Sequence, residues 1–88
     1  MHKHSPTHIA LGNVIRRRRG RLGISQEDLA HRCHFNRTYM GLIERGEVNP
    51  SLAKMLQLAS GLETKLSSLI TSVERDLRRD AMLRKRTQ

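Results

Sequence analysis

Start and stop signals for α-helices divide this 88-residue chain into short segments. Ser25 and Asn36 are of the residue types that cap helix N-termini, and each precedes a stretch with apolar residues at helical spacing. Gly23 and Gly46 follow such stretches, as expected of residues that end helices. No stretch alternates apolar and polar residues as a β-strand does, so the chain is predicted to be all-α. Five helices are expected, at about 7–20, 26–33, 37–45, 52–61 and 66–80.

The second and third predicted helices are short and close together in the sequence. Ser25 and Asp28 have the spacing of a capping box, and Asn36 can cap the next helix after a break at His34 and Phe35. Two short helices joined by a three-residue turn are typical of the helix-turn-helix motif. The segment from Ser25 to Gly46 is therefore the most informative part of the chain.

The length allows one domain, residues 1–88. Its core is expected at about 9–70, followed by a helical extension at 71–80 and a flexible tail at 81–88. The first residues, with His2, His4 and His8, are also expected to be flexible. Because the chain has no Trp, one Tyr and one Phe, the core should be aliphatic.

The charge of the chain indicates a polyanionic partner. Its 17 Lys and Arg against 8 Asp and Glu give a net charge of +9, and residues 1–21 contain no acidic side chain. A balanced middle between basic ends suits nucleic acid. Thirteen of the basic residues are Arg, whose planar fork binds phosphate and guanine edges better than Lys does.

Several classes of function are disfavoured. Cys33 is the only cysteine, so no internal disulfide can form and a reducing, cytoplasmic location is expected. No apolar run approaches the roughly 20 residues of a membrane span. His31 and Cys33 would lie on different faces of a helix, and no second ligand pair has zinc spacing, so no metal is predicted. No pairing of a nucleophile with a base stands out, so we predict neither enzymatic activity nor a cofactor.

The string SQEDLAHRCHFNRTYMGLIERGEVNPSL resembles the Xre/Cro/cI family of phage and bacterial repressors, with SQEDLA, RTY, IERG and NPSL in register. The resemblance runs from about Leu11 to Ile70. The segment FNRTYMGLIERG is similar to controller proteins of restriction–modification systems, which are small stand-alone dimers. The resemblance implies a five-helix, lambda-repressor-like fold and a sequence-specific transcriptional regulator that binds an inverted-repeat operator in double-stranded DNA. Three positions depart from the family, because His34 and Glu63 stand where glycine is usual and Arg18 stands where leucine is frequent.

The third helix would enter the major groove, with Met40 and Ile43 turned inward. Arg37, Thr38 and Leu42 are the candidate base contacts, since Arg37 can pair with guanine O6 and N7 and Leu42 can cover a thymine methyl group. The resemblance implies a phosphate contact for Gln26 and DNA contact by Tyr39, whose ring could instead pack on helix 26–33. The candidate phosphate contacts are Gln26, Tyr39, Asn49 and Ser51.

Two further roles follow from the resemblance. Arg19 and Glu44 occupy the positions of a buried ion pair, whereas Arg16, Arg17 and Arg21 are expected to be solvated or to attract phosphates at long range. The last helix extends past the family's usual end, so its apolar stripe is predicted to form a homodimer interface. The stripe consists of Leu66, Leu69, Ile70, Val73 and Leu77.

Two rival functions remain open at this point. One is an antitoxin that autoregulates its operon and binds a toxin protein through residues 71–88. The other is a membrane or RNA binder built on the basic amphipathic last helix. Binding to duplex DNA without sequence preference would favour the second rival.

Overall fold

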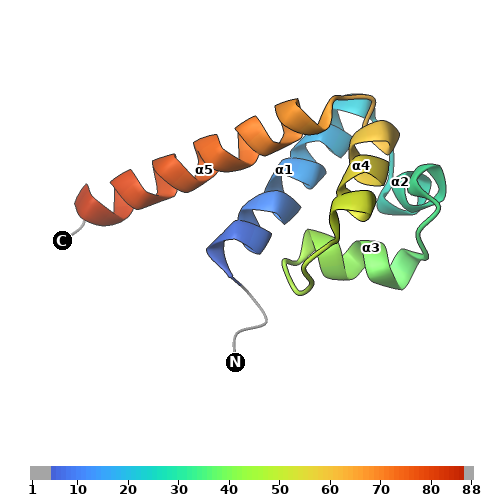
Figure 1. The fold of residues 1–88 in the computed structure, drawn as a ribbon, viewed down its shortest axis with the longest axis horizontal. Helices are drawn as coiled ribbons and strands as arrows, with labels where there is room; N and C mark the ends of the chain where they lie inside the picture. Colours follow the sequence, from blue (N-terminus) through green and yellow to red (C-terminus); the bar gives the residue numbers. More distant parts are fainter. Residues whose placement is uncertain (1–4, 87–88) are drawn as a thin grey trace.

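The structure is a computed structural model that describes residues 5–86, within which five α-helices and no strand occur (Figure 1). The helices are α1 (Pro6–Leu22), α2 (Gln26–Cys33), α3 (Arg37–Glu44), α4 (Leu52–Gly61) and α5 (Leu66–Arg86). The all-α prediction is confirmed. His2 and His4 lie outside the described residues, whereas His8 lies in α1 and not in a flexible terminus. The predicted tail at 81–88 is wrong up to Arg86, because α5 continues through that residue.

The helix boundaries follow the capping signals of the sequence. The Ser5 side chain accepts a hydrogen bond from the His8 amide, and α1 continues past Gly20 until Gly23 adopts a left-handed conformation. The predicted capping box at α2 is present, since the amide of Ser25 donates to the Asp28 carboxylate and the Ser25 hydroxyl accepts from the Asp28 amide, both at 3.0 Å. These hydrogen bonds lower the pKa of Asp28.

Two of the three positions at which the sequence departs from the family that it resembles have left-handed backbones. His34 has φ of 60° at the end of α2, and Glu63 has φ of 57° just after α4. Residues with a Cβ are tolerated in this region at a cost of about 1 kcal/mol each. The short turns at the ends of α2 and α4 are therefore kept without glycine.

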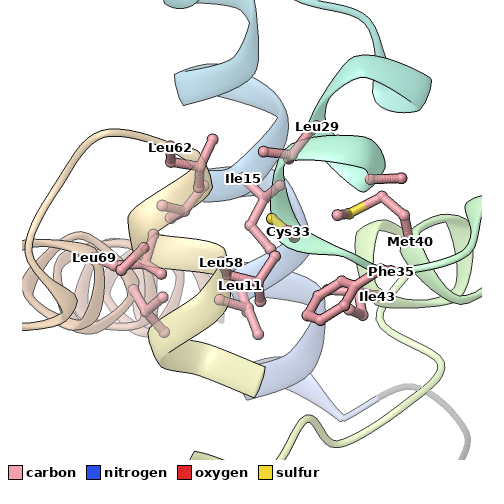
Figure 2. Packing of buried hydrophobic residues seen from close by; sticks show 14 of the residues in the cluster. Leu11, Ile15, Leu29, Cys33, Phe35, Met40, Ile43, Leu58, Leu62 and Leu69 are labelled. Carbon is pink, nitrogen blue, oxygen red and sulfur yellow. The ribbon is translucent and has the colours of Figure 1, made fainter. Parts of the chain in front are cut away.

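The core is aliphatic, as predicted, and lies where α1 packs against both α3 and α5 (Figures 1 and 2). Ile15 of α1, Leu29 of α2 and Leu58 of α4 are fully buried. Met40 and Ile43 turn inward from α3, which leaves the opposite face of that helix exposed. A single aliphatic core thus holds α3 against the long helix α1, and α2 against α3 and α4.

The core extends further along α5 than the sequence indicated. Leu69 and Val73 are buried in the monomer, and Leu77 packs against the same core. Val73 therefore needs no partner subunit to be buried, and the predicted limit of the core at residue 70 is wrong. The cause is the length of α1, whose packing on α5 covers these side chains. Ile70 alone of the predicted interface stripe is exposed, with Leu66 and Leu77 half-buried.

Two further sequence inferences can be compared with the described residues. No helix among them is both long and apolar enough to cross a membrane. They also contain no group of three or more His, Cys, Asp or Glu residues suited to a metal ion.

Cys33 is buried, and this burial raises the pKa of its thiol to about 11. At neutral pH the thiol is therefore protonated, which makes it a poor nucleophile.

Two glycines of α1 give a matched test of this packing. A Cβ at Gly12 would lie 2.2 Å from the backbone oxygen of Glu44, whereas a Cβ at Gly20 would meet nothing within 4 Å. Gly12→Ala should lower the free energy of unfolding by about 2 kcal/mol or more, because α1 and α3 must separate. Gly20→Ala should raise it by about 0.5–1 kcal/mol, since alanine favours the helix. Urea denaturation measures both, and a harmless Gly12→Ala would contradict the close approach of the two helices.

Candidate nucleic-acid interface

The second and third helices form a compact pair with one outward face. The Asn36 side chain accepts a hydrogen bond from the Tyr39 amide at 2.7 Å, which fixes the start of α3. Arg37 and Thr38 occupy the first turn of α3, and both are exposed. The inward turn of Met40 thereby aims these two side chains away from the core.

A shallow concavity of about 290 Å³ lies on this face. Its lining joins Gln26 of α2 to Arg37, Thr38 and Gly41 of α3, and to Arg45 just after α3. Gly41 keeps the middle open, since a Cβ there would lie 3.1 Å from Nη1 of Arg45. The lining contains two guanidinium groups and no acidic side chain. Arg45 donates its Nε to the Glu47 carboxylate at 3.0 Å, so its Nη groups and the guanidinium of Arg37 are the donors that face an anionic ligand.

Leu42 and Tyr39 lie beside this concavity, and both are half-buried. The Tyr39 ring packs edge-on against Phe35, with 5.3 Å between ring centroids. The Lys54 ammonium lies 5.3 Å from the centroid of the Phe35 ring and 5.5 Å from that of Tyr39. The ring of Tyr39 therefore rests on the turn residue Phe35 and on Lys54 of α4.

The other two predicted phosphate contacts lie just before α4. Ser51 is the N-cap of that helix, and its hydroxyl oxygen accepts a hydrogen bond from the Lys54 amide at 3.2 Å. Its hydroxyl proton stays available as a donor. Asn49 is exposed in the preceding loop. The structure thus leaves polar donors from both residues at the surface.

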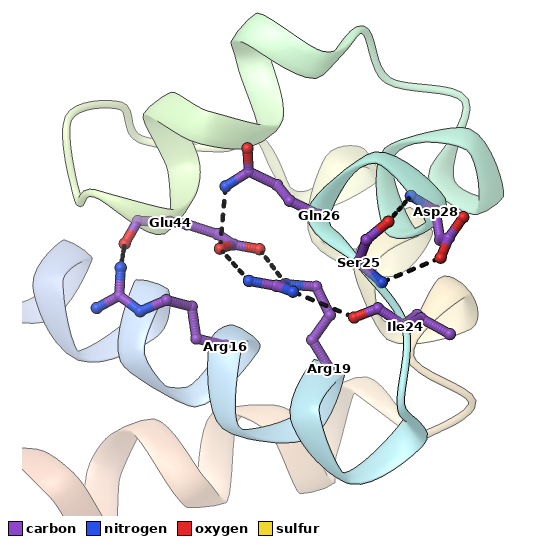
Figure 3. A network of polar contacts seen from close by, with 7 residues as sticks. All are labelled: Arg16, Arg19, Ile24, Ser25, Gln26, Asp28 and Glu44. Atoms are coloured by element: carbon purple, nitrogen blue, oxygen red, sulfur yellow. Dashed lines mark hydrogen bonds and ion pairs between the residues drawn. The ribbon is translucent and has the colours of Figure 1, made fainter.

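Glu44 organises a polar network behind the concavity (Figure 3). Arg19 binds its carboxylate through two hydrogen bonds, of 2.9 Å from Nε and 3.1 Å from Nη2. Gln26 donates its Nε2 to Oε1 of the same carboxylate at 3.1 Å. Arg19 also donates to the Ile24 carbonyl at 3.1 Å, just before the capping box of α2. Glu44, which is 2% exposed, thereby connects α1, α2 and α3.

Several interactions near this face were not predicted from the sequence. Arg16 was expected to be solvated, but it donates to the backbone oxygen of Glu44 at 2.8 Å. Arg17 pairs instead with Asp76 of α5 at 2.9 Å. Arg45 was not considered, although positions 37, 41 and 45 lie on one helical face, and that spacing could have identified it. Lys54 left no such signal, because only the fold brings it to Tyr39.

Comparison with known proteins identifies the family. Residues 10–68 match the family model for a helix-turn-helix domain. The chain is also 33% identical over 69 residues to control protein C.MunI from a Mycoplasma species, an alignment that covers 77% of this chain and 93% of the relative. This chain is a helix-turn-helix protein of the Xre/Cro/cI family. The resemblance inferred from the sequence is confirmed.

Two solved structures of restriction–modification controller proteins are similar to this helix-turn-helix protein. It is similar to the restriction–modification controller protein C.AhdI from Aeromonas hydrophila, with 37% identity and a TM-score of 0.68 over 70% of this chain and 94% of that one. It is also similar to the controller C.Esp1396I, solved as a tetramer with its natural 35-base-pair operator. That match has 27% identity and a TM-score of 0.77, and covers 84% of this chain and 97% of the other.

The network around Glu44 gives a second test. Glu44→Gln removes the charge that Arg19 faces, so the free energy of unfolding should fall by about 3 kcal/mol or more. Glu74→Gln, on the exposed surface of α5, is the matched control and should change it by less than about 0.5 kcal/mol. Chemical denaturation of both variants at pH 7 measures the difference. Equal stabilities would show that the pair does not hold the helices together.

Proposed function

We propose that this protein is a sequence-specific transcriptional regulator that binds an inverted-repeat operator in double-stranded DNA as a homodimer, with α3 in the major groove. The observation that carries the proposal is the concavity in which Gln26, Arg37, Thr38 and Arg45 converge without an acidic side chain. An α-helix has the width to enter the major groove, and the exposed first turn of α3 carries Arg37 and Thr38.

Within this proposal, Arg37 and Thr38 read bases from the first turn of α3. Arg37 pairs with guanine, and the Thr38 hydroxyl and methyl groups contact a neighbouring base. Leu42 is half-buried at the side of α3, where its exposed part covers a thymine methyl group. Arg45 lies on the same helical face as Arg37, just after α3, and binds the operator at the far end of the concavity.

Gln26, Tyr39, Asn49 and Ser51 hold the phosphate backbone in the proposed complex. Gln26 keeps one amide proton and its carbonyl oxygen free after donating to Glu44, and it lies at the start of α2, where backbone amides face outward. The rings beneath Lys54 hold its ammonium near Tyr39, so we add Lys54 to the phosphate contacts. These contacts fix the register of the helix on DNA and carry no base information.

A homodimer accounts for the apolar surface of α4 and α5. Leu52, Leu56 and Ile70 are exposed by 70%, 53% and 39%, respectively. Met55 and Ile70 line one hollow of about 170 Å³, so the exposed sides of the two helices adjoin there. Leu69 and Val73 are buried within the monomer, so we propose this exposed face as the dimer interface. A dimer would place two copies of α3 about 34 Å apart, as two half-sites require.

The controller relatives favour a regulator over an antitoxin. C.MunI, C.AhdI and C.Esp1396I are named as control or controller proteins, and the last was solved with an operator. The antitoxin alternative would need a toxin to bind the end of α5. We therefore propose the regulator alone.

The role of Arg37 can be tested by binding-site selection. Arg37→Ala should weaken binding to the selected operator by about 1–3 kcal/mol and relax the preference at one base pair in each half-site. Arg78→Ala, an exposed arginine on α5, is the control and should select the wild-type motif. Selection of no motif by the wild type would refute specific recognition and favour an RNA or membrane partner.

The dimer face is tested by sedimentation. Leu56→Asp with Ile70→Asp should convert a dimer to a folded monomer at micromolar concentration, because two charges would be desolvated in the interface. Met82→Asp is matched to it, since Met82 is exposed by 65% but lies near the end of α5. The control should sediment as the wild type does. A double variant that remains dimeric would exclude this face as the interface.

A further inference from the structure

A second basic surface lies between α1 and α5. It is a groove of about 570 Å³ whose lining includes Arg17, Arg18 and Arg21 of α1 and Arg75 and Arg79 of α5. α1 packs on both α3 and α5 and so separates this groove from the concavity around Arg37 (Figure 1). The proposed contact with an operator through α3 leaves the groove unused.

The charge of the groove is largely uncompensated. Asp76 is the one acidic residue in its lining, and it is only 6% exposed. Its carboxylate binds Arg17 at 2.9 Å and Arg79 at 2.7 Å. Five arginines against one aspartate leave an excess of four positive charges. Arg18, Arg21 and Arg75 have no salt bridge within the described residues 5–86.

Small hydroxyl side chains form the α5 side of the groove. Ser67, Ser68, Thr71 and Ser72 line it over the first turns of the helix. Thr71 donates its hydroxyl proton to the Ser67 carbonyl at 2.8 Å, so the three serines are the available hydroxyl donors. Short hydroxyl side chains let a ligand approach the helix closely while offering hydrogen bonds.

Arg18 contributes an unsatisfied donor at this site. Its Nε is buried and has no hydrogen-bond partner. A buried N–H without a partner is destabilising by about 1–3 kcal/mol, so the guanidinium of Arg18 is held beside the groove at some cost in stability.

We propose that the groove between α1 and α5 binds a small anion that carries several phosphate groups. Guanidinium forks match phosphate oxygens in pairs, and the excess of positive charge favours a ligand with more than one negative charge. The volume lies in the range of about 300–1,000 Å³ that small-molecule sites occupy. The hydroxyl and guanidinium lining disfavours an apolar ligand. The proposal does not depend on operator binding.

Titration calorimetry with inorganic tripolyphosphate on the full chain tests the site. At fixed ionic strength the wild type should bind with saturation, and Arg75→Gln should weaken binding about tenfold, the loss expected for one charge-assisted hydrogen-bonding group. Arg78→Gln removes the same charge from the same helix outside the groove lining, and should change the affinity less than twofold. Arg75 is exposed, so its variant should keep the fold, as circular dichroism can verify.

The outcomes separate this ligand from the alternatives. Absence of saturable binding, or an equal loss in Arg75→Gln and Arg78→Gln, would overturn the proposal and leave only general attraction by a basic helix. The last measurement is the binding of both variants to a random-sequence duplex DNA. If Arg75→Gln weakens duplex binding as strongly as it weakens tripolyphosphate binding, the groove is a DNA contact and the proposal is wrong. Unchanged duplex binding by Arg75→Gln would support a separate site for a small phosphorylated ligand.

Discussion

The buried carboxylate of Glu44 is the interaction on which the arrangement of the helices depends. It sits at the end of α3, accepts two hydrogen bonds from Arg19 of α1, and accepts one from Gln26 of α2. Its backbone oxygen accepts a further hydrogen bond from Arg16. A buried ion pair adds little net stability, but the loss of one partner leaves an unpaired charge in the interior. The network therefore acts mainly on specificity of structure, because few other packings of these helices would satisfy every donor.

The same carboxylate connects the core to the exposed face. Gln26 is held by Glu44 on one side and lines the concavity on the other. Glycine supports this arrangement twice, since Gly12 lets α1 approach the backbone of Glu44 and Gly41 keeps the middle of the concavity open. The position of the proposed DNA-reading groups is thus fixed by interior contacts, made by residues that do not themselves contact the ligand.

The helices could be predicted from local signals in the sequence, whereas the contacts between distant segments could not. Ser25, Asp28 and Asn36 act within four residues of their partners, so the starts of α2 and α3 could be inferred from the sequence. The family resemblance supplied the pairing of Arg19 with Glu44. The burial of Val73 and the partners of Arg16 and Arg17 depend on how α1 lies across the fold, which no local pattern encodes. The end of α5 was placed too early because its polar, basic composition resembles that of a frayed terminus.

α1 gives the molecule two basic surfaces with different chemistry. On the side of α3, Arg16 and Arg19 are held by Glu44, and the exposed donors belong to α2, α3 and the residue that follows α3. On the side of α5, Arg17 is held by Asp76, but Arg18 and Arg21 are left beside Arg75. A run of arginines on one helix therefore does not act as one patch, because the helical turn directs its members to different neighbours. The arginines accordingly form a small face suited to a duplex and a larger groove suited to a compact anion.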